Sequence, residues 1–402
     1  MCSVHSARPF GPRARYTIPT MFGLHSGSKR EIVAVADIGS SSAAVAIVAL
    51  GSDQPAVVLS QHRTDVTMGE RSAEALASTI ASALEQSAQT ARLNLPDEHV
   101  AEQISSVYAC VHAPWTRSTI AHALQTYDED IKVTPDVIAK IGNEALSASG
   151  REHADFFETS VVRVELNGYP TGSPVGKTAH RILASALSST CDDALYRAAS
   201  DALARQFPNT RIRWRSAARA IVATSNALSG KQGDGIIIIT IGREAASIIV
   251  VRRGVLDQEE LLSDGLHALL RRIGGDSVQE MLNVLHLIGQ DMCDSAACES
   301  MRTALARVEP DLVRLFGERF AKLATHRRLP SRIILLAHPD VQQWLSKFFA
   351  RIDFTQFSVT SQPFSVVPLQ PSSMGHLVIT EGKLTPDASL LVSVACAQIE
   401  SD

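Results

Sequence analysis

Two matching patterns of apolar and polar residues dominate the chain. Near its start, apolar runs at 32–36 and 43–50 flank the polar turn Asp37-Ile-Gly-Ser-Ser-Ser42. Later, residues 235–256, GIIIITIGREAASIIVVRRGVL, repeat this layout of an apolar run, a glycine-containing turn and a second apolar run. Short runs rich in Val and Ile are typical of buried strands, so both stretches are predicted to be β-hairpins. Such an internal repeat indicates two related α/β halves.

The rest of the pattern alternates between strands and helices, which is typical of an α/β sheet. Further strands are predicted at 56–59, 104–112 and 332–336. Apolar residues at helical spacing predict helices at 71–92, 192–206, 217–228, 264–273, 276–289, 296–325, 339–351 and 386–398.

Residues 113–195 differ from the rest of the first half in their pattern of predicted strands and helices. A polar hairpin at 116–133 precedes a helix at 135–148, and strands are predicted at 160–166 and 178–187. We interpret this range as a small α+β module inserted into the first sheet. Its loop Gly172-Ser-Pro-Val-Gly-Lys-Thr178 has only three residues between the glycines, and a strand follows it. A phosphate-binding P-loop needs four residues and a helix, so we predict a surface turn.

These patterns divide the chain into segments. Residues 1–30 contain five basic residues, no acidic residue and no long apolar run, and are predicted to be a disordered basic segment. The other predicted segments are the first half at 31–112 and 196–230, the inserted module at 113–195, and the second half at 231–402 with a helical subdomain at about 276–330.

Composition narrows the range of functions. The 402 residues are 45% hydrophobic and 20% charged, and the net charge of −4 gives no basic field for nucleic acid. The apolar runs are too short for a transmembrane helix. The acidic tail 398–402 has no basic and aromatic pattern, so no direct membrane anchor is expected. The six cysteines form no CxxC pair, which favours reduced thiols in a cytoplasmic protein.

The first hairpin turn carries the clearest candidate chemistry. Gly39 allows a close approach of backbone to a ligand, and the hydroxyl groups of Ser40, Ser41 and Ser42 can cradle a phosphate. Asp37 ends a buried strand and needs a partner, which a hydrated Mg²⁺ would supply. The alternative is an ordinary tight hairpin whose Asp37 is satisfied by the protein.

The order of the motifs resembles the actin-like ATPase superfold, and within it the bacterial cell-division protein FtsA and the pilus-assembly protein PilM. Residues 36–50 resemble the first phosphate hairpin, and QISSVYACVHA at 103–113 resembles the FtsA strand that leads into the inserted module. The remaining stretches that carry the resemblance are VELNGYPTGSPVGK at 164–177, the second hairpin at 236–256, SRIILLAHPDVQQWL at 331–345 and DASLLVSVACA at 387–397. The resemblance covers about residues 31–399.

The resemblance implies a cleft in which the two hairpins hold nucleotide phosphates, with an Asp on each hairpin helping to hold Mg²⁺. Here Asp37 and the glycine and serines of the first hairpin are in place. The second hairpin keeps Gly242 but has lost both acids of the family's DxGGGTTD motif, and Arg243 follows Gly242. Arg243 would either bind phosphate or fill the pocket by pairing with Asp37, and we favour filling.

The adenosine strand departs from the family as well. Ala337, His338 and Pro339 stand where a pair of glycines normally lets the base approach the backbone. We therefore expect a pseudo-ATPase that does not hydrolyse ATP and needs no cofactor. Two alternatives stay open: weak binding of ATP with Mg²⁺ at the two hairpins, and slow hydrolysis that uses Asp37 alone.

The resemblance also implies protein partners. The leading expectation is an FtsA-like scaffold of bacterial cell division that docks protein partners, with a PilM-like adaptor as the alternative. The scaffold would bind the acidic tail of the tubulin-like protein FtsZ, and the basic residues that would receive it are Arg307, Arg314, Arg319 and Lys322. The alternative for this helix is a solvated face offset by Glu309, Asp311 and Glu318. A PilM-like adaptor would instead bind the cytoplasmic tail of a pilus membrane protein near the inserted module. Either protein would be cytoplasmic, associate with the membrane through its partner, and have a fold that allows filaments.

Overall fold

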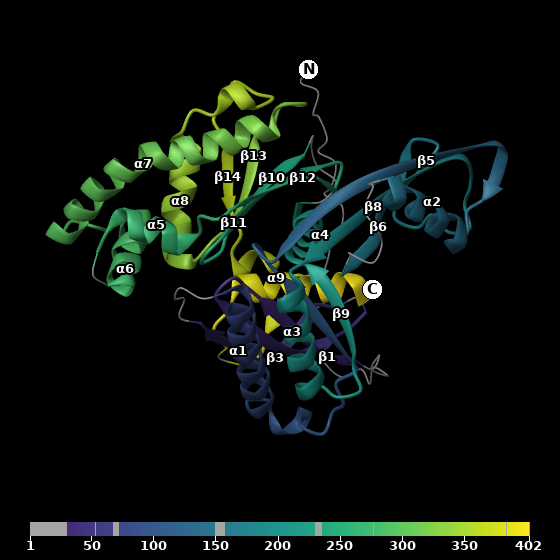
Figure 1. Ribbon diagram of the computed structural model, residues 1–402, viewed down its shortest axis with the longest axis horizontal. Coiled ribbons are helices and arrows are strands. Elements are labelled where there is room, and N and C mark those ends of the chain that lie inside the picture. The colour runs from purple at the N-terminus through teal and green to yellow at the C-terminus, as the bar shows by residue number, and fades with distance from the viewer. Residues whose placement is uncertain are drawn as a thin grey trace, which may run out of the picture.

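The computed structural model describes residues 30–52, 54–66, 72–148, 157–229, 235–275, 277–382 and 384–401 (Figure 1). Apart from Arg30, the predicted N-terminal segment 1–30 lies outside the described residues. The described chain forms three sheets, and the two larger ones lie above and below a layer of helices in Figure 1.

The first sheet is built on the first predicted hairpin. Its strands, in spatial order, are β15 (Val378–Thr380), β3 (Ala56–Asp65), β2 (Ser42–Leu50), β1 (Glu31–Ile38), β4 (Ser106–Val111) and β9 (Arg211–Ser216). β1 and β2 are antiparallel, whereas β4 runs parallel to β1. All nine residues of β2 are buried, because helices cover both faces of the sheet.

The helices on the outer face of this sheet are α1 (Ala73–Leu93) and α3 (Asp193–Gln206), which pack against each other. Each begins at a side chain that caps its free backbone N–H groups: Ser72 accepts from Ala75 N, and Asp192 accepts from Leu195 N. The 3₁₀ turn η1 (Asp97–His99) follows α1. The inner face is covered by α4 (Ala217–Ser229) and α9 (Ala388–Ser401).

The second sheet repeats the arrangement of the first. Its strands, in spatial order, are β12 (Val255–Leu262), β11 (Ala246–Arg252), β10 (Ile236–Ile241), β13 (Arg332–Leu336) and β14 (Ser365–Pro368). β10 and β11 form the second predicted hairpin, and β13 runs parallel to β10 as β4 does to β1. The helices α5 (Leu266–Ile273), α6 (Val278–Gly289), α7 (Ala296–Leu323) and α8 (Pro339–Arg351) share one hydrophobic core with this sheet.

The last part of the chain does not stay with the second half, to which 231–402 was assigned from the sequence. After the 3₁₀ turns η3 (Thr355–Phe357) and η4 (Pro371–Met374), β15 pairs with β3 of the first sheet. α9 is buried along residues 390–398 and shares a core with both large sheets. A helix that is apolar on nearly all sides needs cover on both sides, which only the position between the sheets supplies.

The third sheet projects from the two halves and lies within the range 113–195 (Figure 1). Its strands, in spatial order, are β5 (Thr116–Lys132), β8 (Thr178–Cys191), β6 (Glu158–Leu166) and β7 (Tyr169–Thr171), and α2 (Pro135–Ala148) covers one face. The loop 172–177 connects β7 to β8. The prediction of a turn followed by a strand, and not of a P-loop, is confirmed.

Two further expectations concern the cysteines and the membrane. Cys293 and Cys298 form a disulfide, so the expectation that all cysteines are thiols is wrong; their spacing of five residues gave no signal in the sequence. Cys110 and Cys396 are buried thiols, and Cys191 is a half-buried one. Within the described part of the chain, the length and apolar character needed to cross a bilayer are not combined in any helix.

Candidate functional site

A large cavity lies between the two halves. Its volume is about 1440 Å³, and both hairpins contribute to its wall. Asp37, Gly39 and Ser40 line it from the first hairpin, and Gly242 and Arg243 line it from the second. Other parts of the wall include the ends of β3 and β13, α4, the end of α6 and the beginnings of α8 and α9. Asp37 and Gly242 therefore face the same space from opposite halves, as the resemblance to a clefted ATPase implied.

The two hairpin turns have the same geometry and touch each other. Gly39 N donates to Ser42 O at 2.8 Å, and Gly242 N donates to Ala245 O at 2.9 Å. A Cβ at Gly242 would lie 3.0 Å from Ala245 O, which explains the glycine in this turn. The hydroxyl of Ser40 accepts a hydrogen bond from the backbone N–H of Glu244 at 3.1 Å. The tips that would hold a phosphate between them are therefore in direct contact.

Asp37 is almost completely buried, with 1% of its side chain exposed. Its Oδ1 accepts from His112 Nε2 at 2.6 Å and from Ser393 Oγ at 2.8 Å. Its Oδ2 accepts from Arg63 Nη2 at 2.7 Å and from Ser389 Oγ at 3.0 Å. A carboxylate has about four lone-pair positions, and here each has a donor from the protein.

These contacts keep Asp37 ionised. Burial by itself raises the pKa of this carboxyl group, but the neighbouring His112 and Arg63 hold the pKa well below its ordinary value. The alternative left open from the sequence, an Asp37 that the protein itself satisfies, is the one observed.

Arg63 of β3, which the sequence analysis did not single out, is the cation that pairs with Asp37. Its Nε also lies 2.5 Å from Asp387 Oδ2, and its Nη1 donates to Ser42 Oγ at 2.9 Å. Asp387 lies just before α9, whose Ser389 and Leu390 N–H groups donate to it. Arg63 thus ties the first hairpin to the beginning of the last helix.

The expectation that Arg243 fills the pocket by pairing with Asp37 is wrong. Arg243 Nη2 instead lies 2.7 Å from Asp65 Oδ1, at the end of β3. The reason is the register of the first sheet, in which Asp37 is opposite Ala44 on β2 and Ala44 is opposite Arg63 on β3. Directly opposed residues share a face of a sheet, and the methyl group of Ala44 leaves room for the Arg63 side chain to pass over it.

The three serines of the first turn have different environments. Ser40 contacts the second hairpin and Ser42 accepts from Arg63, whereas the buried Ser41 hydroxyl has no hydrogen-bond partner among the described residues. In the second turn, the side chain of Glu244 pairs with His267. Two of the three hydroxyl groups expected to cradle a phosphate are therefore already used within the protein.

The expected adenosine side of the cleft is lined by Ala337, His338 and Pro339. His338 caps α8, because its Nδ1 accepts from Asp340 N at 3.4 Å. Burial lowers the pKa of His338, and the nearby Arg243 acts in the same direction. Asp65 and the other acids around the cleft oppose this shift.

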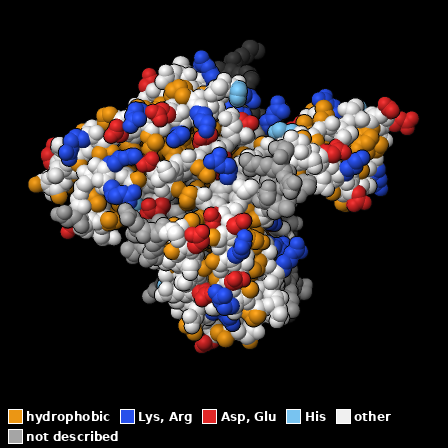
Figure 2. Space-filling model, in the orientation of Figure 1, with side chains coloured by type: hydrophobic (Ala, Val, Ile, Leu, Met, Phe, Trp, Pro, Cys, Tyr) orange, Lys and Arg blue, Asp and Glu red, His pale blue; other side chains and the backbone are white. Residues whose placement is uncertain are grey.

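The residues predicted to dock an acidic tail lie along α7. Arg314 pairs with Asp311 and Glu318 of the same helix, and Lys322 pairs with Glu260 of β12 at 2.7 Å. Figure 2 shows basic and acidic side chains interspersed over this region. Arg307 is exposed and Arg319 is half-buried. Docking at this face stays a prediction, but two of the four cations, Arg314 and Lys322, already pair with acidic side chains of the protein.

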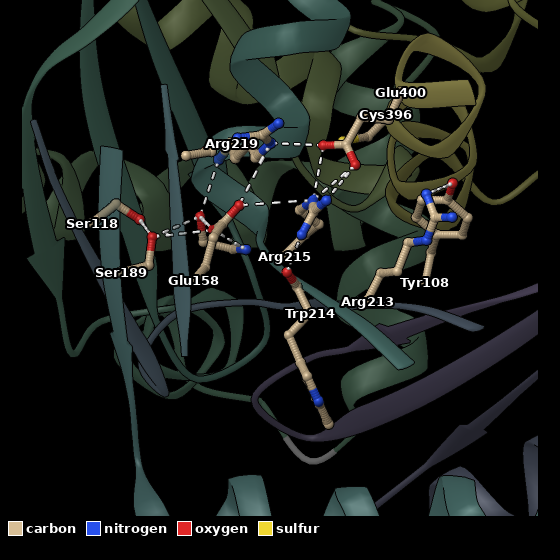
Figure 3. A network of polar contacts seen from close by, with 12 residues as sticks. Tyr108, Ser118, Glu158, Ser189, Arg213, Trp214, Arg215, Arg219, Cys396 and Glu400 are labelled. Atoms are coloured by element: carbon tan, nitrogen blue, oxygen red, sulfur yellow. Dashed lines mark hydrogen bonds and ion pairs between the residues drawn. The ribbon is translucent and has the colours of Figure 1, made fainter. Parts of the chain in front are cut away.

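A second buried polar network fastens the inserted module to the first half (Figure 3). Glu158 of β6 accepts from the backbone N–H and the hydroxyl of Ser216, both at 2.8 Å. Arg215 and Arg219 each lie 2.7 Å from Glu400 of α9, and Arg219 Nε lies 3.5 Å from Glu158. Burial raises the pKa of Glu158 in spite of the arginines. The network connects the module, α4 and α9 and does not line the cavity.

Comparisons with known proteins identify the fold. No protein-family model and no curated protein matches the sequence. A chain of the PilM-PilN type IV pilus biogenesis complex superposes with a TM-score of 0.53 at 11% identity, covering 92% of this chain and 98% of that chain. A ROK family glucokinase from Streptomyces griseus has a TM-score of 0.40 at 14% identity, covering 90% and 98%. The ethanolamine utilization protein EutJ from Carboxydothermus hydrogenoformans has a TM-score of 0.37 at 10% identity, covering 92% and 89%.

The likeness to the chain of the PilM-PilN complex, with its TM-score of 0.53, shows the fold. The chain has the actin-like ATPase fold, as the order of its motifs predicted, and PilM is among its structural neighbours. The finer likeness to FtsA stays a prediction. The Mg²⁺ that the fold implies does not fit at Asp37 as it stands, because every acceptor position of this carboxylate has a donor from the protein. The hairpin tips also touch through Ser40 and Glu244 N. That the chain needs no nucleotide stays a prediction.

Proposed function

We propose that this chain is a protein-binding adaptor with the actin-like ATPase fold that does not hydrolyse ATP. The observation that supports this most strongly is the set of four donors around Asp37. Mg²⁺ is bound through carboxylate oxygens and water, and phosphoryl transfer depends on the metal and on positioned groups. A carboxylate whose lone pairs are all engaged has none to give to a metal.

The second hairpin supports the same proposal. Its turn has no aspartate, and the carboxylate nearest the tip, Glu244, pairs with His267. The contact between Ser40 and Glu244 N closes the space between the tips, where a phosphate would have to lie. Both sides of a phosphate clamp are therefore committed to contacts within the protein.

The kind of partner is argued from two observations. The structural neighbour PilM was solved as a complex with PilN, so a pilus-assembly partner is consistent with an adaptor of this fold. An FtsA-like scaffold would rely on the basic face of α7, where Arg314 and Lys322 are offset by acids. We therefore favour an adaptor for the cytoplasmic tail of a pilus membrane protein, which would locate the chain in the cytoplasm at the membrane surface.

Calorimetric titration of the full chain with Mg·ATP tests the nucleotide part of the proposal. We expect no binding heat at millimolar ATP. In a separate thermal denaturation, adding Mg·ATP should not change the melting temperature. Asp37→Asn, which keeps the shape of the side chain, should behave like the wild type in this assay. Micromolar affinity that is lost in Asp37→Asn would overturn the proposal and favour a working nucleotide site.

Binding of two immobilised peptides tests the partner. One carries the cytoplasmic tail of the pilus membrane protein and the other the acidic tail of FtsZ, each with a scrambled control. We expect the chain to bind the pilus peptide. Binding of the FtsZ peptide alone, lost in Arg307→Ala, would support the division scaffold instead. Binding of neither peptide would count against the adaptor.

A further inference from the structure

We propose that Arg63 is a resident cation, whose guanidinium permanently takes the place of a divalent ion in the cleft. The inference deepens the proposed function and rests on it, because it explains how the cleft is held without nucleotide or metal. The group concerned, which we name the Arg63 clasp, consists of Asp37, Ser42, Arg63 and Asp387. It joins β1, β2, β3 and the beginning of α9.

The oxygen atoms of the clasp are of the kind that coordinate a metal ion. Asp37 Oδ2, Asp387 Oδ2 and Ser42 Oγ converge on one guanidinium, at 2.7, 2.5 and 2.9 Å from its three nitrogens. Two carboxylates and a hydroxyl are ligands that a hard divalent cation prefers. Here one planar cation with a fixed fork of N–H donors satisfies all three oxygens at once.

The charges also agree with this interpretation. Asp37 is 1% exposed, and Arg63 and Asp387 are 23% and 24% exposed, so water compensates these charges only in part. Burial by itself lowers the pKa of Arg63, but Asp387 and Asp37 raise the pKa above its ordinary value. The guanidinium therefore stays charged, and the carboxylates keep a cation that cannot dissociate from the chain.

The position of Arg63 in the sheet explains how its guanidinium reaches the place that a free cation would otherwise take. Ala44 lies between Asp37 and Arg63 in the sheet register, so the side chain reaches across one strand to the carboxylate. Asp65, two residues further along β3, pairs with Arg243 of the second hairpin. The end of β3 thus supplies an Arg to the first hairpin and an Asp to the second, and both pairs lie where a metal and phosphates would be needed.

Removing the guanidinium should turn the clasp into a divalent-cation site. In Arg63→Ala, one lone pair of Asp37, one of Asp387 and the hydroxyl of Ser42 lose their donor together, next to a space of guanidinium size. Asp37 would keep its contacts with His112, Ser389 and Ser393, but it would lose its arginine partner. Removing one partner of a buried carboxylate is costly, and a hydrated cation in the vacated space would offset that cost. No nucleotide is needed for this binding.

The test uses the full chain and Mn²⁺ alone, measured by electron paramagnetic resonance and calorimetry. We expect the wild type to bind no Mn²⁺ and Arg63→Ala to bind about one per chain, with a higher melting temperature when Mn²⁺ is present. The double variant Arg63→Ala/Asp387→Asn should lose this site. Arg243→Ala is the matched control, because its carboxylate partner Asp65 is 55% exposed and no site should appear there.

Several outcomes would overturn the inference. One is a folded Arg63→Ala that binds no Mn²⁺, and another is a wild type that binds Mn²⁺ as tightly as the variant. If Arg63→Ala does not fold, Arg63→Gln is refolded with and without Mn²⁺. Recovery of folded protein only with Mn²⁺ supports the inference. Equal recovery of folded protein in both conditions overturns it. Because the test contains no ATP, its failure is distinct from failure of the proposed function, which the Mg·ATP titration of the wild type reports.

Discussion

Arg243 and Asp65 form an ion pair across the cleft, with 2.7 Å between Nη2 and Oδ1. Arg243 belongs to the second hairpin and Asp65 to the end of β3, so the pair connects the two halves. Their side chains are 30% and 55% exposed, whereas Asp37 in the neighbouring pair is 1% exposed. The two pairs should therefore contribute very differently to stability.

For the exposed pair, we expect a small effect. A double-mutant cycle of Arg243→Ala and Asp65→Ala should give a coupling energy below about 1 kcal/mol, because water and salt screen exposed charges. Urea denaturation of the four proteins measures it, and high salt should reduce it further. A coupling energy of several kcal/mol would show that this pair fastens the two halves together.

For the buried pair, we expect a large effect. Asp37→Ala leaves the Arg63 guanidinium without one of its two carboxylates and should lower the free energy of unfolding by about 3–5 kcal/mol. Urea denaturation measures this loss, and Asp340→Ala, at a carboxylate that is 26% exposed, is the control. A loss below about 1 kcal/mol would contradict the role of Asp37 as the centre of the cleft.

A larger side chain at residue 44 should act on the same pair indirectly. Ala44→Leu places a branched side chain in the path of Arg63, between the two strands that it spans. Overpacking of this kind typically costs about 1–3 kcal/mol of stability, and here it should also separate Arg63 from Asp37. Ala46→Leu, at another completely buried position of β2, is the control for crowding alone.

The comparison of the two Leu variants decides the prediction. The free energy of unfolding is measured at neutral pH and again at acid pH, where protonation weakens an Asp37 that has lost its cation. Ala44→Leu should show the greater loss in acid. An equal acid sensitivity of both variants would mean that the path over Ala44 is not needed.

Glu259 should make stability depend on pH. This glutamate of β12 accepts from Ser118 N of β5 at 2.7 Å, and burial raises its pKa to about 7 although Arg117 opposes the shift. Because the folded pKa lies above the unfolded value, the stabilising contribution is complete at low pH and is lost as the pH rises toward 7. The loss between pH 5 and pH 8 should be roughly 1–3 kcal/mol.

Urea denaturation at both pH values measures this loss. Glu259→Gln should remove most of it. Glu260→Gln removes only the smallest of the causes that act on the pKa of Glu259, so most of the loss should remain in that variant. The buried Glu158 also has a raised pKa and acts in the same direction, so some dependence should remain in Glu259→Gln. An unchanged pH dependence in Glu259→Gln would contradict the assignment.

The architecture was largely readable from the sequence because both hairpins are long, apolar and interrupted by a glycine-containing turn. The strands β1, β2, β10 and β11 lie where the apolar runs predicted them. The position at which the last helix packs could not be predicted from the sequence. Apolar residues on nearly all sides of α9 predict burial, but they do not say which sheets it packs between.

The candidate site was readable only in part. Asp37, Gly39 and Gly242 face the cavity, as the motifs predicted. Arg63, His112 and Asp387 were missed as partners of Asp37, because each lies far from it in the sequence. His112 and Asp387 lie in the stretches 103–113 and 387–397 that carry the resemblance, but neither stretch indicated a contact with Asp37. A polar residue on β3 at the position of Arg63 has no distinctive spacing, so nothing in the sequence alone pointed to its pairing with Asp37.

The sequence by itself determined that two similar α/β halves exist and that the second hairpin turn contains no aspartate, because these are properties of local runs and turns. Only the tertiary structure decided which cation pairs with Asp37. That choice depends on strand register and on the return of α9 to the first half, which bring Asp37, Arg63 and Asp387 together from three distant parts of the chain. Contacts of this kind follow from packing and leave no periodic trace in the sequence.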